Sequence, residues 1–153
     1  MQHRFQTFDR YPTHTDYRFV DWDEYAVGEE RDLLGTDGVA TCLAITLYDG
    51  EKRRGALAHI SGIYQDIEEL KPQNIIGTLL SRLEDAKRID LTKLEATLSG
   101  EGCISSERQR CSPIVKSKLK EYGIPIIGED LCRAPARLVF LHCDTGRVGV
   151  YRA

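Results

Sequence analysis

A cysteine and a histidine stand on two neighbouring stretches of the chain, and each stretch has the pattern of a β-strand. Cys42 lies near the start of the run Val39–Tyr48, and His59 lies near the end of the run Gly55–Ser61. A thiol beside an imidazole is the minimum equipment for nucleophilic catalysis by cysteine. This chemistry requires that the fold bring the two side chains together.

The order of the two runs predicts an antiparallel hairpin. The connector, residues 49–54, reads Asp-Gly-Glu-Lys-Arg-Arg and is turn-prone. A hairpin that pairs Tyr48 with Gly55 makes the cysteine and the histidine diagonal neighbours on one face, roughly 7–8 Å apart at Cα. A tighter turn centred on residues 49 and 50 changes the register but again leaves a diagonal pair on one face.

The same pair also has an ordinary packing interpretation. Cysteine is among the most buried residue types, and a histidine on a strand is often a structural residue. Alternation along the first run places Leu43, Ile45 and Leu47 on a face predicted to be core, and Cys42 on a smaller, more polar face. Residue types and spacing alone leave both the catalytic and the packing interpretation open.

Length and composition indicate one globular domain. The chain has 153 residues, 41% hydrophobic and 29% charged, which suits a folded domain rather than a disordered one. A net charge of −3 gives no support to a nucleic-acid or anionic-membrane partner. No apolar run reaches the roughly 18–20 residues that span a bilayer, and the first residues lack the apolar core of a secretory signal. We therefore expect a cytoplasmic protein without membrane insertion.

The cysteines are scattered and show no CxxC spacing. They are Cys42, Cys103, Cys111, Cys132 and Cys143. An odd number at irregular spacing argues against a disulfide framework, and the last four together with His142 match no common metal site. The sequence therefore predicts no metal ion, and a reducing cytosol as the setting.

The remaining pattern predicts a mixed α/β order of elements. An amphipathic helix is expected over residues 73–88, and a second helix over 112–122, where Ser112 is the expected N-cap and Gly123 the stop. Further strands are expected at residues 23–27, 94–98, 124–128, 138–142 and 147–151. Residues 1–20 are predicted to be an N-terminal extension, and 21–153 one domain. The expected fold class is α+β or layered α/β, with mixed, mostly antiparallel sheets and two main helices.

Several stretches of the chain together follow one recognisable pattern. They are Glu24–Val27, Thr36, Thr41–Ile45, Tyr48-Asp49, Gly55–His59, Tyr122–Asp130, Ala136-Arg137 and Asp144–Val148. This pattern resembles the CheD family of chemoreceptor glutamine deamidases. The likeness extends from about residue 23 to residue 152, and implies a CheD-like fold over the predicted domain.

The resemblance also implies a catalytic set. The family's cysteine, histidine and threonine fall on Cys42, His59 and Thr36. The implied roles are attack by the thiolate of Cys42 on a glutamine carboxamide, proton transfer by His59, and orientation of His59 by Thr36. The N–H groups of Thr41 and Cys42 are the expected donors to the oxyanion. Neither a metal nor an organic cofactor is implied.

The implied partners are proteins. The substrate is a glutamine side chain presented by a chemoreceptor or another protein, and the family also implies a regulatory phosphatase-type partner. The chain departs from the family at Ala40, which replaces a glycine, and at residues 99–103 and 131–133. These departures leave two alternatives, which are a catalytically attenuated binding module of CheD type and a deamidase effector that acts on a protein other than a chemoreceptor.

Overall fold

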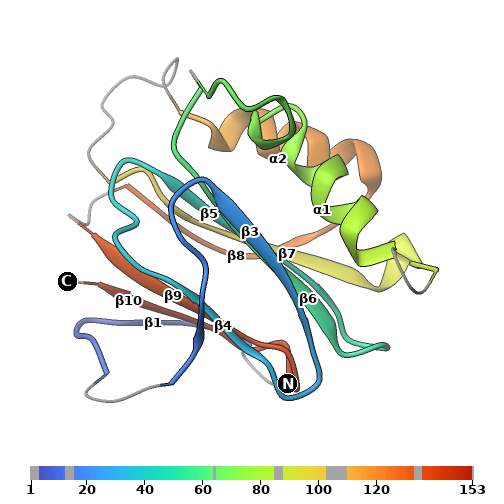
Figure 1. Ribbon diagram of the computed structural model, residues 1–153, viewed down its shortest axis with the longest axis horizontal. Coiled ribbons are helices and arrows are strands. Elements are labelled where there is room, and N and C mark those ends of the chain that lie inside the picture. Colours follow the sequence, from blue (N-terminus) through green and yellow to red (C-terminus); the bar gives the residue numbers. More distant parts are fainter. Residues whose placement is uncertain are drawn as a thin grey trace.

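The chain folds into three layers, which are a pair of helices and two β-sheets packed face to face. The computed structural model describes residues 4–12, 16–63, 65–84, 88–102, 110–132 and 136–152. Figure 1 shows the helices α1 (Ile75–Glu84) and α2 (Ser112–Tyr122) side by side over one sheet, with the other sheet on the far side. This is the α+β fold class predicted from the sequence, with two mixed sheets and two main helices.

The inner sheet lies between the helices and the other sheet. Its strands, in order across the sheet, are β3 (Glu24–Glu29), β6 (Arg54–Ile60), β5 (Leu43–Asp49), β7 (Leu94–Gly100) and β8 (Ile126–Leu131). Neighbouring strands are antiparallel except β7 and β8, which are parallel. Both faces of this sheet are covered, which explains why all seven residues of β5 are buried.

The outer sheet packs with one face on the inner sheet, and no described helix covers its other face. Its strands, in order, are β1 (Phe5–Phe8), β10 (Val148–Arg152), β9 (Arg137–His142), β4 (Leu33–Thr36) and β2 (Arg18–Phe19). The pairs β10–β9 and β9–β4 are antiparallel, while β1 and β2 add at the two edges in parallel. Segments from before residue 21 therefore form both edges of this sheet.

The hairpin of β5 and β6 has the predicted register. Tyr48 pairs with Gly55, and Ala44 pairs with His59. The first strand begins at Leu43, four residues later than predicted. The backbone before it has other partners: the Val39 N–H donates to the Arg137 carbonyl, and the Ala40 carbonyl accepts from the Gly102 N–H.

Alternating residues of β5 enter two separate cores. Leu43, Ile45 and Leu47 pack under the helices, as predicted. The opposite face, predicted to be the more polar one, is also core, because Ala44 and Tyr48 pack between the two sheets. A sequence shows alternation but not that a second sheet covers the second face. Each fully buried leucine or isoleucine contributes about 1.5–3 kcal/mol to folding.

The second helix has a capping partner that the sequence analysis did not identify. The carboxylate of Glu101 accepts hydrogen bonds from the N–H groups of Cys111 (2.6 Å) and Ser112 (3.2 Å) and from the Ser112 hydroxyl (2.5 Å). Ser112 is therefore the first helical residue, and Glu101 supplies the acceptor expected of an N-cap side chain. Gly123 ends the helix in the left-handed conformation, as predicted.

The first helix is amphipathic, as predicted, and its apolar stripe faces the inner sheet. Its bounds, Ile75–Glu84, lie inside the predicted range, and residues 85–87 lie outside the described residues. The buried residues of the stripe are Ile75, Ile76, Leu79, Leu80 and Leu83. They recur at the spacing that places one face of a helix against a core.

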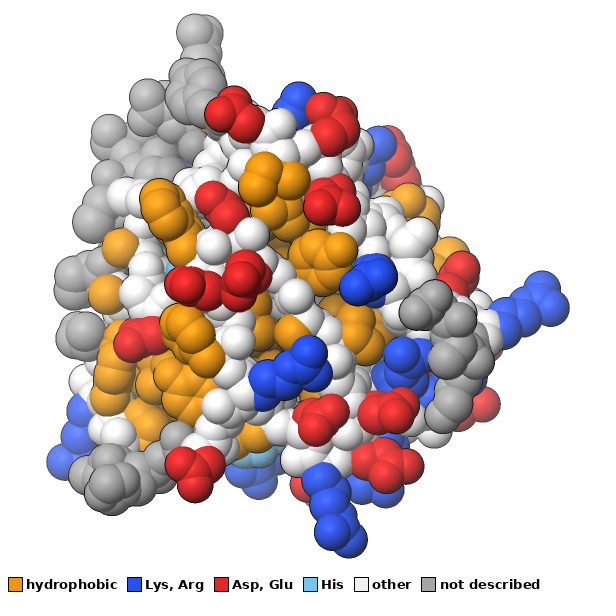
Figure 2. Space-filling model, viewed as in Figure 1, with side chains coloured by type: hydrophobic (Ala, Val, Ile, Leu, Met, Phe, Trp, Pro, Cys, Tyr) orange, Lys and Arg blue, Asp and Glu red, His pale blue; other side chains and the backbone are white. Residues whose placement is uncertain are grey.

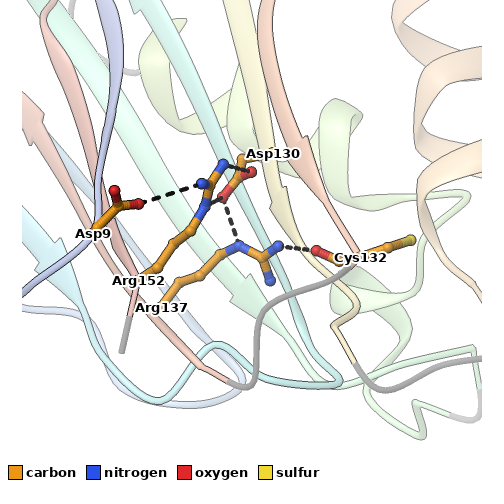
Figure 3. A network of polar contacts seen from close by, with 5 residues as sticks. All are labelled: Asp9, Asp130, Cys132, Arg137 and Arg152. Atoms are coloured by element: carbon orange, nitrogen blue, oxygen red, sulfur yellow. Dashed lines mark hydrogen bonds and ion pairs between the residues drawn. The ribbon is translucent and has the colours of Figure 1, made fainter.

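An ion network joins the two sheets near the carboxyl end of β8. Asp130 of the inner sheet accepts from Nε of Arg137 (2.8 Å) and from Nη2 of Arg152 (2.5 Å), which belong to the outer sheet (Figure 3). Arg137 also donates to the carbonyl of Cys132, and its side chain is fully buried. Burial alone would raise the pKa of Asp130, but the hydrogen bonds from the two arginines outweigh it and lower that pKa.

Aromatic side chains cover the open face of the outer sheet. Phe8 stacks on Tyr151 with ring centroids 4.6 Å apart, and Phe140 meets Tyr151 and Tyr17 edge to face. Figure 2 shows hydrophobic side chains gathered at the lower left, where Figure 1 places strands of this sheet. Phe140 is almost completely buried beneath the two tyrosines. These aromatic contacts therefore remove apolar surface from water on a face that no described helix covers.

Candidate active site

Two of the three predicted site residues are in direct contact, and they come from different sheets. Thr36 is the last residue of β4 in the outer sheet, and His59 is the penultimate residue of β6 in the inner sheet. The Thr36 hydroxyl lies 2.7 Å from Nδ1 of His59, and both side chains are buried. The hydrogen bond fixes the imidazole ring between the two sheets.

The other ring nitrogen of His59 is buried without a partner among the described residues. Nε2 has no hydrogen bond there, although Nδ1 has one. An unpaired buried polar atom costs about 1–3 kcal/mol. If Nδ1 carries the proton and donates it to Thr36, Nε2 has a free lone pair that can accept a proton.

Cys42 lies directly before β5, at the end of the hairpin where Ala44 pairs with His59. The Ala44–His59 pair makes the cysteine a diagonal neighbour of the histidine, as predicted. The cysteine is 7% exposed, and its sulfur accepts a 2.9 Å hydrogen bond from the indole N–H of Trp22. Because Asp23, the next residue, acts electrostatically on both Cys42 and His59, thiol and imidazole share one neighbourhood.

A tight turn before β3 holds these neighbours in place. The carboxylate of Asp21 accepts from the Trp22 N–H, and the Asp21 N–H donates to the side chain of Glu24. Asp23 has a left-handed backbone with φ of 55°, and its N–H donates to the His59 carbonyl at 2.8 Å. The Asp23 carboxylate accepts from the Ser61 N–H at 2.9 Å. The turn is thereby attached to the strand of His59.

Burial sets the protonation of the thiol. Removal from water raises the pKa of Cys42 above its ordinary value of 9.0. Hydrogen bonds from Trp22 and Thr41 lower it, and the charge of Asp23 raises it, but burial dominates. The resting thiol is therefore protonated near neutral pH.

Burial also keeps the imidazole neutral. It lowers the pKa of His59 below its ordinary 6.5, and this outweighs the opposite effect of Asp23, Asp21 and Asp37. A neutral imidazole can accept a proton, which a preformed imidazolium cannot. The two shifts together describe a neutral thiol–imidazole pair rather than a thiolate–imidazolium pair at rest.

Thr41, predicted as an oxyanion donor, is exposed and adjoins the thiol. Its side chain hydrogen-bonds to Cys42, and this contact favours the thiolate. The backbone around the cysteine is held by Gly100 and Glu101: the Glu101 N–H donates to the Cys42 carbonyl at 2.8 Å. Gly100 has φ of +133°, and a Cβ there would overlap that same carbonyl oxygen.

Of the other described cysteines, Cys111 is an electrostatic neighbour of Cys42. Cys111 occupies the position before α2, Cys143 is buried between the sheets, and His142 ends β9, while Cys103 lies outside the described residues. The four described cysteines are free thiols. Among the described residues no group of three or more histidine, cysteine or acidic side chains could hold a metal ion. No described helix is long and apolar enough to cross a membrane.

Trp22 is the site residue that sequence reasoning missed. It precedes the matched stretch that begins at Glu24, so the resemblance did not include it. The available signal was composition, because this is the only tryptophan of the chain and it stands beside a predicted strand. Its contact with a thiol twenty residues away depends on the pairing of β3 with β6, which a sequence does not display.

These residues belong to a single-domain α+β protein in which a Thr36–His59 hydrogen bond joins the two sheets and Cys42 lies directly before the adjoining strand β5. No family model matches the chain. Curated relatives do match. A probable chemoreceptor glutamine deamidase CheD of Haloarcula marismortui is 29% identical over 134 residues, covering 80% of this chain and 78% of the relative. The chemoreceptor glutamine deamidase CheD of Thermotoga maritima is 28% identical over 133 residues, covering 82% and 85%. Over most of its length the chain is thus similar, at 28–29% identity, to curated chemoreceptor glutamine deamidases of the CheD family.

Solved structures give a weaker likeness. A Neisseria meningitidis protein of family-model DUF152 aligns with a TM-score of 0.48 and 14% identity, over 72% of this chain and 54% of that one. The Bacillus licheniformis hypothetical protein YfiH aligns with a TM-score of 0.49 and 13% identity, over 86% and 65%. The chain thus spans about half to two thirds of the length of these structures.

Proposed function

We propose that this protein is a cysteine-dependent deamidase that converts glutamine side chains of proteins to glutamate. The observation that carries the proposal is the Thr36–His59 hydrogen bond beside Cys42. Nε2 of the same ring has no hydrogen-bond partner among the described residues, and Cys42 is a diagonal neighbour on the adjoining strand. The names of the curated relatives describe this same activity on chemoreceptors.

The first half of the proposed reaction forms a thioester. Nε2 of His59 takes the proton of Cys42 as the sulfur attacks the carboxamide carbon. The tetrahedral intermediate carries an oxyanion, for which the N–H groups of Thr41 and Cys42 are the proposed donors. The imidazolium then protonates the amide nitrogen, the C–N bond breaks, and ammonia leaves.

The second half restores the enzyme. His59, neutral again, takes a proton from a water molecule that attacks the thioester carbonyl. The C–S bond breaks, the thiolate of Cys42 recovers a proton from the imidazolium, and glutamate is released. Thr36 keeps Nδ1 protonated in both halves, so that Nε2 is the nitrogen that exchanges protons. In the net reaction, one carboxamide and one water give one carboxylic acid and one ammonia.

The proposed substrate is a glutamine presented by another protein in the cytoplasm, either a chemoreceptor or a protein outside chemotaxis. Free thiols at all four described cysteines fit a reducing compartment. A regulatory phosphatase-type partner is part of the same proposal. It rests on the family relationship alone.

Ammonia release and hydroxylamine trapping test this function together. The wild-type protein is incubated with a glutamine-containing chemoreceptor fragment and with neutral glutamine peptides. Ammonia is expected, and added hydroxylamine should divert the thioester to a hydroxamate. Cys42→Ser and His59→Ala should give neither product. Ammonia release that is unchanged in Cys42→Ser contradicts the proposed mechanism.

A second candidate is a catalytically attenuated binding module of the same family. The observation in its favour is the state of Cys42: it is 7% exposed, its sulfur accepts a hydrogen bond from Trp22, and burial raises the pKa of its thiol. Site-resolved alkylation distinguishes the two. A catalytic Cys42 loses reactivity in His59→Ala, whereas the thiol of a binding module reacts slowly and equally in both proteins.

A further inference from the structure

The only tryptophan of the chain lies against the sulfur of the proposed nucleophile. Nε1 of Trp22 donates to Sγ of Cys42 at 2.9 Å, while 60% of the tryptophan remains exposed. Large exposed apolar side chains are normally of little consequence singly. Here the exposed ring is hydrogen-bonded to a thiol that is itself almost buried, so the contact joins the protein surface to the sulfur.

The turn that carries this tryptophan is held at both ends. Before the ring, the Asp21 carboxylate accepts the Trp22 N–H at 2.7 Å. After it, Asp23 is tied to Ser61 through its carboxylate and to His59 through its backbone. The backbone that carries the indole is thus attached to the same strand that carries the imidazole.

A thiolate accepts this hydrogen bond more strongly than a thiol does. Indole N–H is a donor only, so the contact has one possible direction. Hydrogen bonds to charged groups are about twice as strong as those between neutral groups. The bond therefore strengthens as the proton leaves the sulfur, which is the change that attack on a carboxamide requires.

We propose that Trp22 is a positioning residue for Cys42: its indole N–H fixes the sulfur beside His59 and stabilises the thiolate as it forms. This role rests on the proposed deamidase function for its effect on turnover, but the effect on the thiol exists without any substrate. Trp22 touches the nucleophile and not the carboxamide carbon, so it orients the attack and does not carry a proton.

Other groups around the sulfur influence the same ionisation. Asp23 disfavours the thiolate, and the Thr41 side chain favours it. The thiol of Cys111, at the start of α2, is the next ionisable neighbour, with the Glu101 carboxylate beside it. His59 lies on the adjoining strand. A test of Trp22 must leave these groups unchanged, and a substitution that keeps an aromatic ring does so.

Trp22→Phe removes the donor and keeps the ring. The rate of alkylation of Cys42, followed by mass spectrometry of its own peptide, is measured against pH in both proteins. The midpoint is expected to move upward by about one pH unit in the variant, because one charge-assisted hydrogen bond is lost. Phe19→Leu, which removes a 53% exposed ring on β2, should leave the midpoint unchanged. A midpoint that is the same in Trp22→Phe and wild type overturns the proposal.

A second measurement leaves Trp22 in place. The fluorescence of the single tryptophan, excited at its red edge, is titrated in wild type and in Cys42→Ala. A thiolate in contact with the ring quenches it, so the difference between the two curves should follow the alkylation midpoint. Equal curves also overturn the proposal, even if Trp22→Phe fails to fold.

Turnover separates this inference from the proposed function. With a neutral glutamine peptide, kcat of Trp22→Phe should fall about tenfold with little change in KM, since the lost bond strengthens after binding. If the alkylation midpoint shifts in Trp22→Phe but the wild type does not deamidate, the proposed function is wrong and the role of Trp22 at the thiol stands. If the wild type deamidates fully but the midpoint is the same in Trp22→Phe, the proposed function stands and the role of Trp22 is wrong.

Discussion

Thr36 and His59 form a hydrogen bond of 2.7 Å that crosses from one sheet to the other. The site therefore depends on how the two sheets pack, and not on the β5–β6 hairpin alone. The hairpin makes Cys42 and His59 diagonal neighbours, while the outer sheet supplies the residue that holds the imidazole ring.

Removal of the Thr36 hydroxyl tests its role in holding the tautomer. We expect Thr36→Val to lower kcat by about 10–100-fold, because a hydrogen bond to a developing imidazolium is worth about 1.5–3 kcal/mol. Thr36→Ser keeps the hydroxyl and should retain most of the activity. Steady-state kinetics on a glutamine peptide gives both values, and equal losses in the two variants would show that only packing matters.

The pH dependence of deamidation follows from the lowered pKa of His59. Activity requires a neutral imidazole, so the acidic limb of the kcat/KM profile should lie below pH 6.5. The alkaline side should show no loss up to pH 9.0, because the thiol is protonated at rest and its pKa is raised above that value. An acidic limb above about pH 7 would mean that burial does not govern the histidine.

His59 also affects folding stability in acid. Its pKa is lower in the folded than in the unfolded protein, so the unfolded state binds more protons as pH falls through about 6.5. Stability from the neutral ring is therefore present above that pH and is lost as pH falls toward the folded pKa. Denaturant melts of wild type and His59→Gln between about pH 5 and 8 should converge at low pH. Parallel curves would contradict this assignment.

The Asp130 network should matter for stability rather than for chemistry. Asp130→Asn leaves the fully buried Arg137 without its carboxylate, and removal of one partner from a buried pair costs about 3–5 kcal/mol. The free energy of unfolding in urea measures the loss. The surface pair of Lys118 and Glu121 is the matched control, since Glu121→Gln should cost well under about 1 kcal/mol.

The backbone at Gly100 should be intolerant of any side chain. Gly100→Ala places a Cβ against the Cys42 carbonyl in a left-handed conformation, so the loop that carries the thiol must shift. We expect loss of deamidation together with lower stability. Gly62→Ala is the control, because nothing lies within 4 Å of the position that its Cβ would take and both properties should be kept. Unchanged kinetics in Gly100→Ala would show that the loop position is not critical.

Local sequence pattern predicted both helices, the β5–β6 hairpin and most of the later strands, but it did not predict β1, β2 or β4. Alternation and turn residues predicted the β5–β6 register, and the positions of Pro113 and Gly123 predicted the second helix with its observed bounds. The three site residues came from resemblance, and the contact of Thr36 with His59 is consistent with it.

The missed features all depend on contacts between distant segments. Trp22 reaches Cys42 only because β3 adds to the hairpin, and Glu101 caps α2 from the end of β7. The burial of the second face of β5 requires a sheet whose strands come from both ends of the chain. Local pattern carries no information on such pairings, because side-chain periodicity describes one element at a time.

Conversion of glutamine to glutamate by wild type and by Cys42→Ala is the most direct test of the central claim. Peptide mass spectrometry of a chemoreceptor fragment and of neutral glutamine peptides would detect the gain of one dalton at each glutamine. We predict conversion by wild type, and none above the uncatalysed rate by Cys42→Ala of equal stability. Conversion by Cys42→Ala at the wild-type rate would contradict the assignment of this thiol as the nucleophile.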